Sequence, residues 1–328
     1  CCATVGIRYG SRDRFASGTV PMGTAHFLEH KMFERADGTS WEDVFSAWGA
    51  EVNAYTSDDS TAYMMSTTKH ASEAVTALLS MVSELSVSRG SVCRERGIIA
   101  EEIRMNADDP WEVCYARMLR GLYTPVREGG NPVREEICGS ETSIRRITPA
   151  ILKRTHEAFY RPDNMILAVA GRVTPEEIVA AVEAACLPSP APKLAASRRR
   201  VRHVPEVYKA ADTVTMDTAK PLFSIGIKIP DVPSEPSALV RLERLASVLS
   251  DVLKYDTHLD SLDAQYAQYE KEGKAFIPKY TKLLHTTPVA CAEEVAKVAD
   301  IDLTDKAFWR DALQTIADQI DLFCELVK

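Results

Sequence analysis

Two histidines and a glutamate lie within one short segment near the start of the chain, His26-Phe-Leu-Glu29-His30. In a helix, positions i, i+3 and i+4 fall on one face, so this spacing brings two imidazoles and a carboxylate together. Neutral imidazoles suit a tetrahedral zinc ion, and a carboxylate beside them can take a proton from the attacking water. The order H-x-x-E-H is the inverted zinc-peptidase (inverzincin) motif. It predicts zinc ligands in His26 and His30, with Glu29 free to act as a base.

A zinc site of this kind needs a third protein ligand, usually a carboxylate from another helix. The segment Glu95–Met105 offers three glutamates, at 95, 101 and 102. Glu95 and Glu102 lie two turns apart on one helix face, whereas Glu101 points about 100° away. We therefore predict Glu102 as the third ligand and Glu95 as a residue that supports a ligand from behind.

Competing interpretations of these residue types are weaker. The H-x-x-E-H pattern could arise by chance on an apolar-faced helix whose two histidines are core residues. His156 begins H-E-A-F-Y, but the second histidine of an H-E-x-x-H motif is absent, so a helix end before Arg161-Pro162 explains it better. Gly129-Gly130 predicts a turn, and Cys1-Cys2 has no histidine placed to activate a thiol. Surface or capping roles are predicted for the remaining histidines: His70, His203, His258 and His285.

Helical and strand-like segments alternate through the first two-thirds of the chain. Strands are predicted at 2–10, 52–55, 61–67, 165–171 (buried), 205–216 and 221–229. Helices are predicted for the apolar stretch through 33, for 40–49, 70–87, 91–106, 110–122 and 148–160, and from 174 onward. The segment Cys186–His203 is rich in proline and arginine and predicts a solvated linker. Beyond 235 only helix is predicted.

Length and composition limit the classes of function. The chain has 328 residues, enough for about two domains, and 45% are hydrophobic, so it can bury a core. A formal charge of −8 argues against nucleic acid as a partner, and no run of 18 apolar residues predicts a membrane span. Eight scattered cysteines without a C-x-x-C pair, and no recognisable signal peptide, predict reduced thiols in a cytoplasmic protein. Residue 1 is Cys rather than Met, so a signal or first strand could precede it.

Four segments in order resemble the M16 zinc metallopeptidases, the family of pitrilysin, insulinase and mitochondrial processing peptidase. They are Gly23–Glu34, Asn53–Thr56, Gly97–Met105 and Phe159–Met165. The continuation His-Lys-Met-Phe-Glu at 30–34 is similar to a bacterial branch associated by name with elongation factor P modification, the YfmH-like proteins. The resemblance covers about residues 1–230.

The resemblance implies an α+β fold of the M16/LuxS type, with helices packed on an antiparallel sheet. By position, the family's single zinc ion would be held by His26, His30 and Glu102, with Glu29 as general base. It further implies that Glu95 supports the site.

The resemblance also implies how substrate is held. Asn53 and Ala54 match the family's edge strand that hydrogen-bonds an extended substrate peptide. Strand addition of this kind reads a backbone without fixing a sequence.

Members of the family pair two similar halves, and the second half supplies an Arg and a Tyr that help hold substrate. Here the second half begins at Val204–Ile229 and then stops. From about 236 the chain resembles the C-terminal helical end of the M3 oligoendopeptidases, without their H-E-x-x-H motif. The predicted domains are an M16-like peptidase domain at 1–186, a linker at 187–203, a truncated second M16-like domain at 204–232 and a helical M3-like tail at 236–328.

The leading functional prediction is a zinc-dependent metalloendopeptidase acting on peptides or small unfolded segments. The alternative is a partner-dependent or inactive M16-like subunit, in which zinc is structural or the site is incomplete. A third interpretation is a non-functional hybrid with a loose junction near 230–245. The expected partners are a peptide substrate and a homologous M16-like subunit or second copy of the chain, with no nucleic acid and no membrane.

Overall fold

The computed structural model describes residues 1–13, 20–128, 130–185 and 206–218, together with the single residues 222, 224, 226 and 228. The chain divides into two compact units, Cys1–Gly226 and Ile227–Lys328, and every element described here belongs to the first. The linker predicted at 187–203 and the tail predicted at 236–328 lie outside the described residues. The predicted domain boundaries therefore stay predictions.

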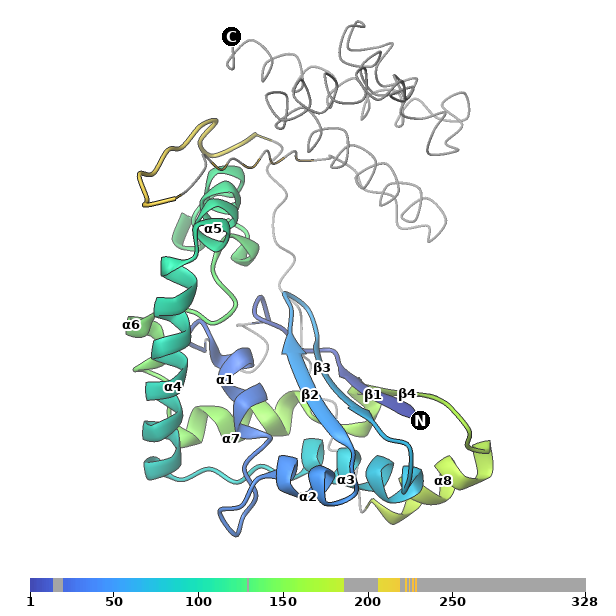
Figure 1. The fold of residues 1–328 in the computed structure, drawn as a ribbon. Coiled ribbons are helices and arrows are strands. Elements are labelled where there is room, and N and C mark those ends of the chain that lie inside the picture. Colours follow the sequence, from blue (N-terminus) through green and yellow to red (C-terminus); the bar gives the residue numbers. More distant parts are fainter. Residues whose placement is uncertain are drawn as a thin grey trace, which may run out of the picture. The chain divides into compact units, whose positions relative to one another are not determined.

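Four strands form one antiparallel sheet in the order β2-β3-β1-β4 (Figure 1). They are β1 (Cys2–Ile7), β2 (Glu51–Thr56), β3 (Thr61–Ser66) and β4 (Met165–Ala170). The register places Val5 opposite both Tyr63 and Leu167, and Ala54 opposite Tyr63. Side chains of one parity in all four strands consequently share a face. The strands predicted at 52–55 and 61–67 are confirmed as β2 and β3, which pair with each other.

That shared face is covered by helices, and the opposite face is open. Val5 and Tyr63 are completely buried in the core that the helices complete. On β4 the side chains alternate, and Ile166 is 75% exposed. The prediction of a buried strand at 165–171 is therefore wrong in its burial, because helices cover only one face of the sheet and every second side chain of β4 lies on the open face.

Eight α-helices are described in this unit (Figure 1). They are α1 (Thr24–Lys31), α2 (Trp41–Ala47), α3 (Ala71–Ser83), α4 (Arg89–Asp108), α5 (Pro110–Leu122), α6 (Glu141–Ile144), α7 (Pro149–Phe159) and α8 (Pro175–Ala184). Short 3-10 turns occupy Val126–Glu128, Pro132–Arg134 and Pro162–Asn164. The predicted helices are confirmed to within a few residues, and the predicted α+β class is confirmed with them.

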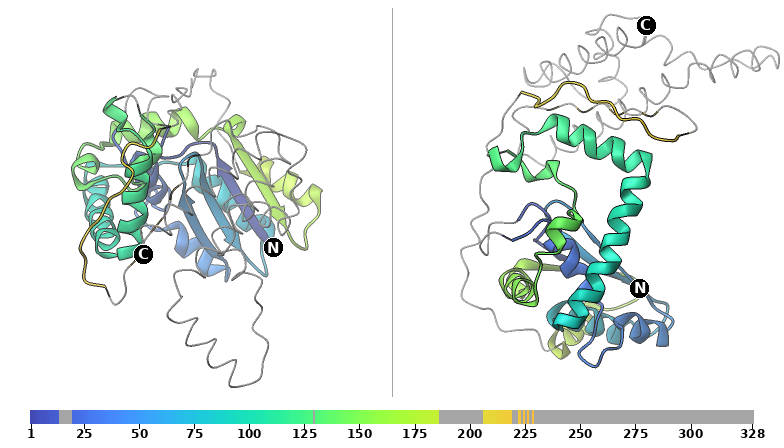
Figure 2. Two further views of the ribbon diagram at one scale, coloured as in Figure 1. Left: turned by 90° about the horizontal axis from the view of Figure 1, so that it is seen from above. Right: turned by 90° about the vertical axis from the view of Figure 1, so that its left-hand side faces the viewer.

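The chain bends sharply between α4 and α5, as the right-hand view of Figure 2 shows. Asp109 ends α4 in an extended conformation, which a residue before proline prefers, and Pro110 begins α5. The Asp109 carboxylate accepts hydrogen bonds from the backbone N–H groups of Trp111 and Glu112. One aspartate thus ends one helix and caps the next.

Residues 206–218 run beside α5 without regular secondary structure. Lys209 N–H donates to the Gly121 carbonyl at 2.9 Å, and Arg117 Nε lies 2.7 Å from Asp212 Oδ2. The strand predicted at 205–216 is wrong for these residues. A strand needs a neighbouring backbone with free ladder groups, whereas most backbone groups of a helix are bonded internally.

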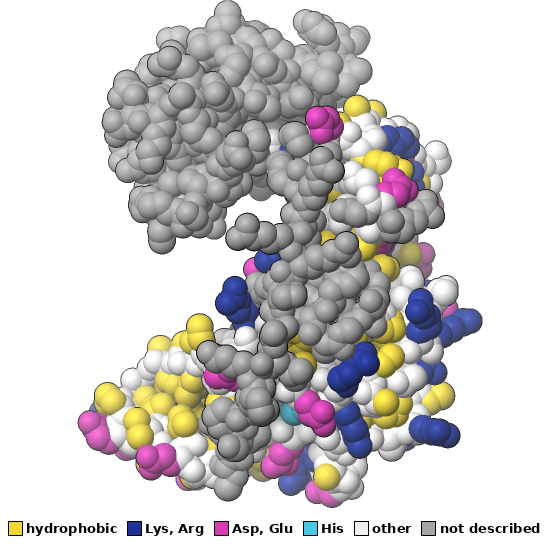
Figure 3. All heavy atoms as spheres, turned by 180° about the vertical axis from the view of Figure 1, so that it is seen from behind, with side chains coloured by type: hydrophobic (Ala, Val, Ile, Leu, Met, Phe, Trp, Pro, Cys, Tyr) yellow, Lys and Arg dark blue, Asp and Glu magenta, His cyan; other side chains and the backbone are white. Residues whose placement is uncertain are grey.

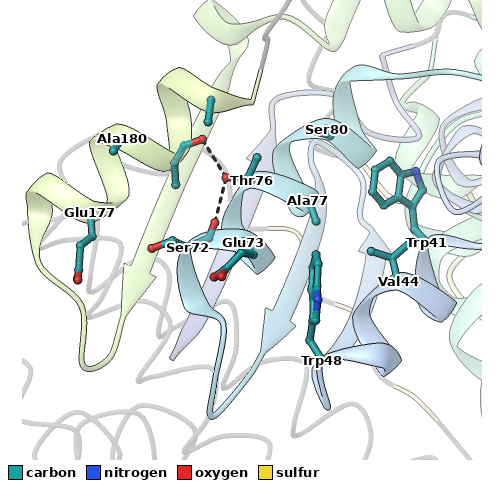
Figure 4. A pocket seen from close by; sticks show the side chains of 12 residues that line it. Trp41, Val44, Trp48, Ser72, Glu73, Thr76, Ala77, Ser80, Glu177 and Ala180 are labelled. Atoms are coloured by element: carbon teal, nitrogen blue, oxygen red, sulfur yellow. Dashed lines mark hydrogen bonds between the residues drawn. The ribbon is translucent and has the colours of Figure 1, made fainter.

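A shallow groove of about 580 Å³ lies between α2, α3 and α8 (Figure 4). Its walls include Trp41 of α2, Trp48 directly after that helix, and small residues of α3 and α8. Thr76 Oγ1 donates to the Ala181 carbonyl at 3.2 Å and joins α3 to α8 across the groove. The face shown in Figure 3 gathers Lys and Arg on the α4 side and hydrophobic side chains towards β4 and α8.

Among the described helices, none combines the length and the hydropathy needed to cross a bilayer. The described cysteines are free thiols. The cytoplasmic location stays a prediction.

Candidate metal centre and active site

The start of α1 is fixed by a glycine that no other residue could replace without movement. Gly23 has φ 82°, in the left-handed region, and a Cβ built on it would lie 2.3 Å from the Cys138 carbonyl oxygen. Only glycine tolerates both conditions at once. Phe27 and Leu28 on the core side of α1 are completely buried. This anchoring turns the opposite side of α1, with the H-x-x-E-H residues, towards β2 and α4.

Helix α4 brings the acidic residues to the site. Ile99, completely buried, lies between Glu95 and Glu102 in the sequence and anchors this face of α4 in the core. Glu95 and Glu102 reach the histidines of α1. Glu101 leaves 70% of its side chain exposed and pairs with Arg104. The helical spacing therefore directs Glu95 and Glu102 towards the histidines and Glu101 towards solvent, as the sequence predicts.

The two imidazoles and the Glu102 carboxylate converge. Glu102 Oε1 lies 3.3 Å from His26 Nε2, and its Oε2 lies 3.6 Å from His30 Nε2. The two rings meet edge to face, with centroids 4.6 Å apart. All three ligand atoms lie within 4.8 Å of one another, and no other group of three such side chains in the described residues does so. Two imidazole nitrogens and one carboxylate oxygen are a donor set that fits catalytic zinc.

The electrostatics of the site favour a cation. Burial lowers the pKa of His30, but the hydrogen bond and charge of Glu95 outweigh it, so the net pKa is raised. The hydrogen bond from His26 lowers the pKa of Glu102, although partial burial opposes it. Negative charge thus surrounds the imidazoles, and the same charge that attracts protons would attract a divalent metal ion.

Glu29 is held beside the ligands by a residue that sequence reasoning missed. Glu29 is 8% exposed, and its Oε2 accepts a hydrogen bond from Thr56 Oγ1 at 2.6 Å. Thr56 is the last residue of β2 and shares the helix-covered face with Val52 and Ala54. The two-residue period of the strand could have placed Thr56 on this face. Only the packing of α1 on β2 could show which side chain it meets.

The Glu95 carboxylate links the metal site to a buried lysine, also missed in the sequence. Glu95 Oε1 lies 3.0 Å from His30 Nδ1. Its Oε2 lies 3.7 Å from Nζ of Lys31, whose side chain is completely buried and also contacts Glu34. Burial raises the pKa of Glu95, yet the contacts with His30 and Lys31 reverse this and lower it overall. Glu95 is consequently an ionised bridge between the imidazole and the ammonium.

A pair of buried tyrosines lies behind Glu29. The hydroxyl groups of Tyr63 and Tyr160 are 2.8 Å apart. Burial is the main cause that raises both pKa values, and the charge of Glu29 adds to it. These hydroxyls consequently stay neutral near the carboxylate.

The predicted substrate residues lie on the free edge of the sheet. Strand β2 pairs only with β3 among the described strands, so its other edge is available to a further strand. Ala54 N–H on this strand donates to its neighbour's Asn53 Oδ1 at 2.8 Å. Both residues belong to this edge strand, and their role in substrate binding stays a prediction.

The remaining histidines have other surroundings. His156 is buried in α7, and its Nε2 lies 3.0 Å from the Val82 carbonyl oxygen, so it joins α7 to α3. His70 is exposed at the N-cap position of α3, which confirms the predicted capping or surface role. His203, His258 and His285 lie outside the described residues.

Two family models match the chain. Residues 3–125 match "Insulinase (Peptidase family M16)", and this range contains the H-x-x-E-H segment and Glu102. Residues 146–269 match "Peptidase M16 inactive domain", a match that extends beyond the predicted end of the second half at 232.

Relatives and solved structures agree with these models. The uncharacterized zinc protease YmfH of Bacillus subtilis is 34% identical over 257 residues, which cover 77% of this chain and 57% of that protein. A probable mitochondrial-processing peptidase subunit beta of Schizosaccharomyces pombe is 33% identical over 186 residues, covering 55% of this chain and 38% of that protein. The chain spans about half the length of the curated relatives that it matches.

Among solved structures, a putative M16-like peptidase from Alicyclobacillus acidocaldarius aligns with a TM-score of 0.51 and 39% identity, covering 56% of this chain and 43% of that one. A protease from Helicobacter pylori aligns with a TM-score of 0.50 and 23% identity, over 57% of this chain and 45% of that one. The second likeness concerns the fold alone.

Proposed function

Because the chain belongs to peptidase family M16, we propose that it is a zinc-dependent endopeptidase that cleaves peptides or small unfolded segments. The observation that carries the proposal is the convergence of His26 Nε2, His30 Nε2 and the Glu102 carboxylate within 4.8 Å, beside the carboxylate of Glu29. We assign one zinc ion to His26, His30 and Glu102. A zinc ion in this position would lower the pKa of a bound water towards neutrality and polarise the scissile carbonyl.

Glu29 acts as the general base. Its carboxylate takes a proton from the attacking water and passes it to the leaving amine, a role worth roughly 10²–10⁴ in rate. The Thr56 hydroxyl holds one carboxylate oxygen at 2.6 Å, so the carboxylate keeps one orientation. The hydroxyls of Tyr63 and Tyr160 stay neutral and add no competing charge near it.

The β2 edge holds the substrate. An extended peptide adds to β2 as a further strand and pairs with backbone groups near Asn53 and Ala54. The Asn53 side chain turns away from Ala54 N–H when a substrate carbonyl takes its place. Pairing of this kind selects for extended conformation and tolerates many sequences, in accord with unfolded segments as substrates.

A second candidate is a subunit that needs a homologous M16-like partner or a second copy of the chain. One observation favours it: the second matched model is described as an inactive domain. In this case zinc binds, but cleavage appears only when a partner completes the substrate chamber.

The experiment that separates these candidates measures zinc content and peptide cleavage together. Wild type is expected to retain one zinc per chain after dialysis, Glu102→Ala to lose it, and Glu29→Gln to keep it without turnover. Cleavage by wild type alone supports the enzyme. Zinc retention without cleavage supports the partner-dependent subunit, and addition of candidate M16-like partners then tests for rescue. A folded wild type without zinc overturns both.

A further inference from the structure

The side chain of Lys31 is completely buried, although its neighbour His30 lies at the edge of the candidate metal centre. Lysine is almost never fully buried unless its charge is paired, because an unpaired ammonium loses its hydration. An apolar side chain of the same length would pack there without this cost, and buried ion pairs contribute little to stability. Packing therefore does not account for a lysine at this position.

The ammonium of Lys31 lies between two carboxylates. It contacts Glu34 three residues along the chain, and its Nζ is 3.7 Å from Glu95 Oε2. Glu95 Oε1, on the same carboxylate, lies 3.0 Å from His30 Nδ1. One rigid group thus joins a buried cation to the back of an imidazole whose other nitrogen faces Glu102 at 3.6 Å.

We propose that Lys31 is a positioning residue for His30, acting through Glu95; the inference rests on the zinc site proposed above. A glutamate side chain has three rotatable bonds, and Lys31 restricts them by attracting the second oxygen across 3.7 Å. The restricted carboxylate then keeps the proton of His30 on Nδ1 and leaves the Nε2 lone pair for the metal. Residues that orient a metal-binding histidine in this way typically change metal affinity by 10–100-fold when removed.

Lys31 also offsets part of the negative charge that gathers around the two imidazoles. Glu29, Glu95 and Glu102 already place three carboxylates around the two imidazoles, and Glu34 adds a fourth behind them. Lys31 brings one positive charge, which two of these carboxylates share inside the protein. Arg94, whose side chain is 72% exposed, lies 3.7 Å from Glu34 and contributes a screened interaction only.

The test is zinc affinity, measured by competition with a chelator. Lys31→Met keeps the length of the side chain and removes the charge, and should weaken zinc binding by about 10–100-fold. Arg94→Met is the matched control, because it removes a positive charge from the same group of residues but from its exposed side, and should bind zinc as wild type does. Circular dichroism of the zinc-free proteins checks that both variants are folded. If Lys31→Met does not fold, Lys31→Gln replaces it, with the same direction expected.

A double variant distinguishes positioning from a general structural effect. If Lys31 acts through Glu95, then Lys31→Met adds little to the loss caused by Glu95→Gln. Cobalt substitution gives a second readout, since a displaced imidazole changes the visible spectrum of the bound metal. Wild-type zinc affinity in Lys31→Met, or full additivity with Glu95→Gln, would overturn this inference alone. A wild type that binds no zinc would overturn the proposed function with it.

Discussion

Replacement of Gly23 by alanine tests whether the start of α1 sets the geometry of the metal centre. The residue combines φ 82° with a Cβ position 2.3 Å from the Cys138 carbonyl oxygen and 3.2 Å from Ile144 Cγ2. Gly38 is a matched control, with φ 85° and nothing within 4 Å of its Cβ position. Both substitutions place an alanine in a left-handed backbone conformation, and only Gly23→Ala also creates a steric clash.

The magnitudes follow from these distances. A left-handed conformation costs an alanine about 1–2 kcal/mol, partly offset by the stiffer unfolded chain, so Gly38→Ala should lose about 1 kcal/mol of stability. At Gly23 real contacts require at least 3.0 Å, so α1 or the Cys138 backbone must move by about 0.7 Å. Overpacking in a filled core adds about 1–3 kcal/mol. Gly23→Ala should therefore lose about 2–4 kcal/mol in total.

The same movement should disturb zinc binding. Metal–ligand distances tolerate shifts of only about 0.2 Å, and His26 lies in the first turn after Gly23. Urea unfolding of the zinc-free proteins gives the stability difference, and chelator competition gives zinc affinity, which should fall at least about tenfold for Gly23→Ala only. Equal losses of stability at the two glycines, or unchanged zinc affinity in Gly23→Ala, would refute the reasoning.

Three further predictions concern other side chains. Thr56→Val removes the hydrogen bond to Glu29 and should lower kcat about tenfold or more while zinc content stays unchanged. A fall in zinc content as large as the fall in kcat would instead show that Thr56 supports the fold. Burial lowers the pKa of His156 despite its backbone hydrogen bond, so the unfolded chain takes up a proton first and stability should fall as pH drops below about 6.5. His156→Gln should flatten that part of a pH series of unfolding curves, and an unchanged slope would contradict it. Burial, aided by nearby carboxylates, raises the pKa of Cys138 from 9.0 to about 11, so at pH 8 its thiolate is about 100-fold rarer than that of a thiol with the ordinary pKa. Mass spectrometry should find that Cys138 is alkylated at least that much more slowly than the exposed Cys93. Similar alkylation rates would contradict the burial of Cys138.

The elements that carry the chemistry were predictable because their signals are local. The H-x-x-E-H spacing needs only a helix to bring its side chains together, and the spacing of Glu95 and Glu102 needs only a second helix. Apolar residues at helical spacing indicate such helices.

Thr56 and Lys31 were missed because their roles depend on which elements pack together. A threonine at the end of a strand and a lysine after a histidine have no distinctive pattern of their own. The burial of β4 was predicted wrongly for a related reason, since the apolar run Met165–Ala170 is compatible with a sheet covered on both faces and with one covered on a single face.

The hydrogen bond between Asn53 Oδ1 and Ala54 N–H has a consequence for solubility. An unpaired sheet edge is a template on which other chains can add strands and aggregate. On β2 one edge donor is already satisfied by a neighbouring side chain, and Glu51 places an exposed charge at the start of the strand. A strand of another chain must therefore displace this hydrogen bond. Its pairing is stabilised only by the difference in free energy between the new hydrogen bond and the one it replaces. The free edge can therefore bind a peptide that is also held by other contacts, while it disfavours non-specific strand pairing between copies of the chain.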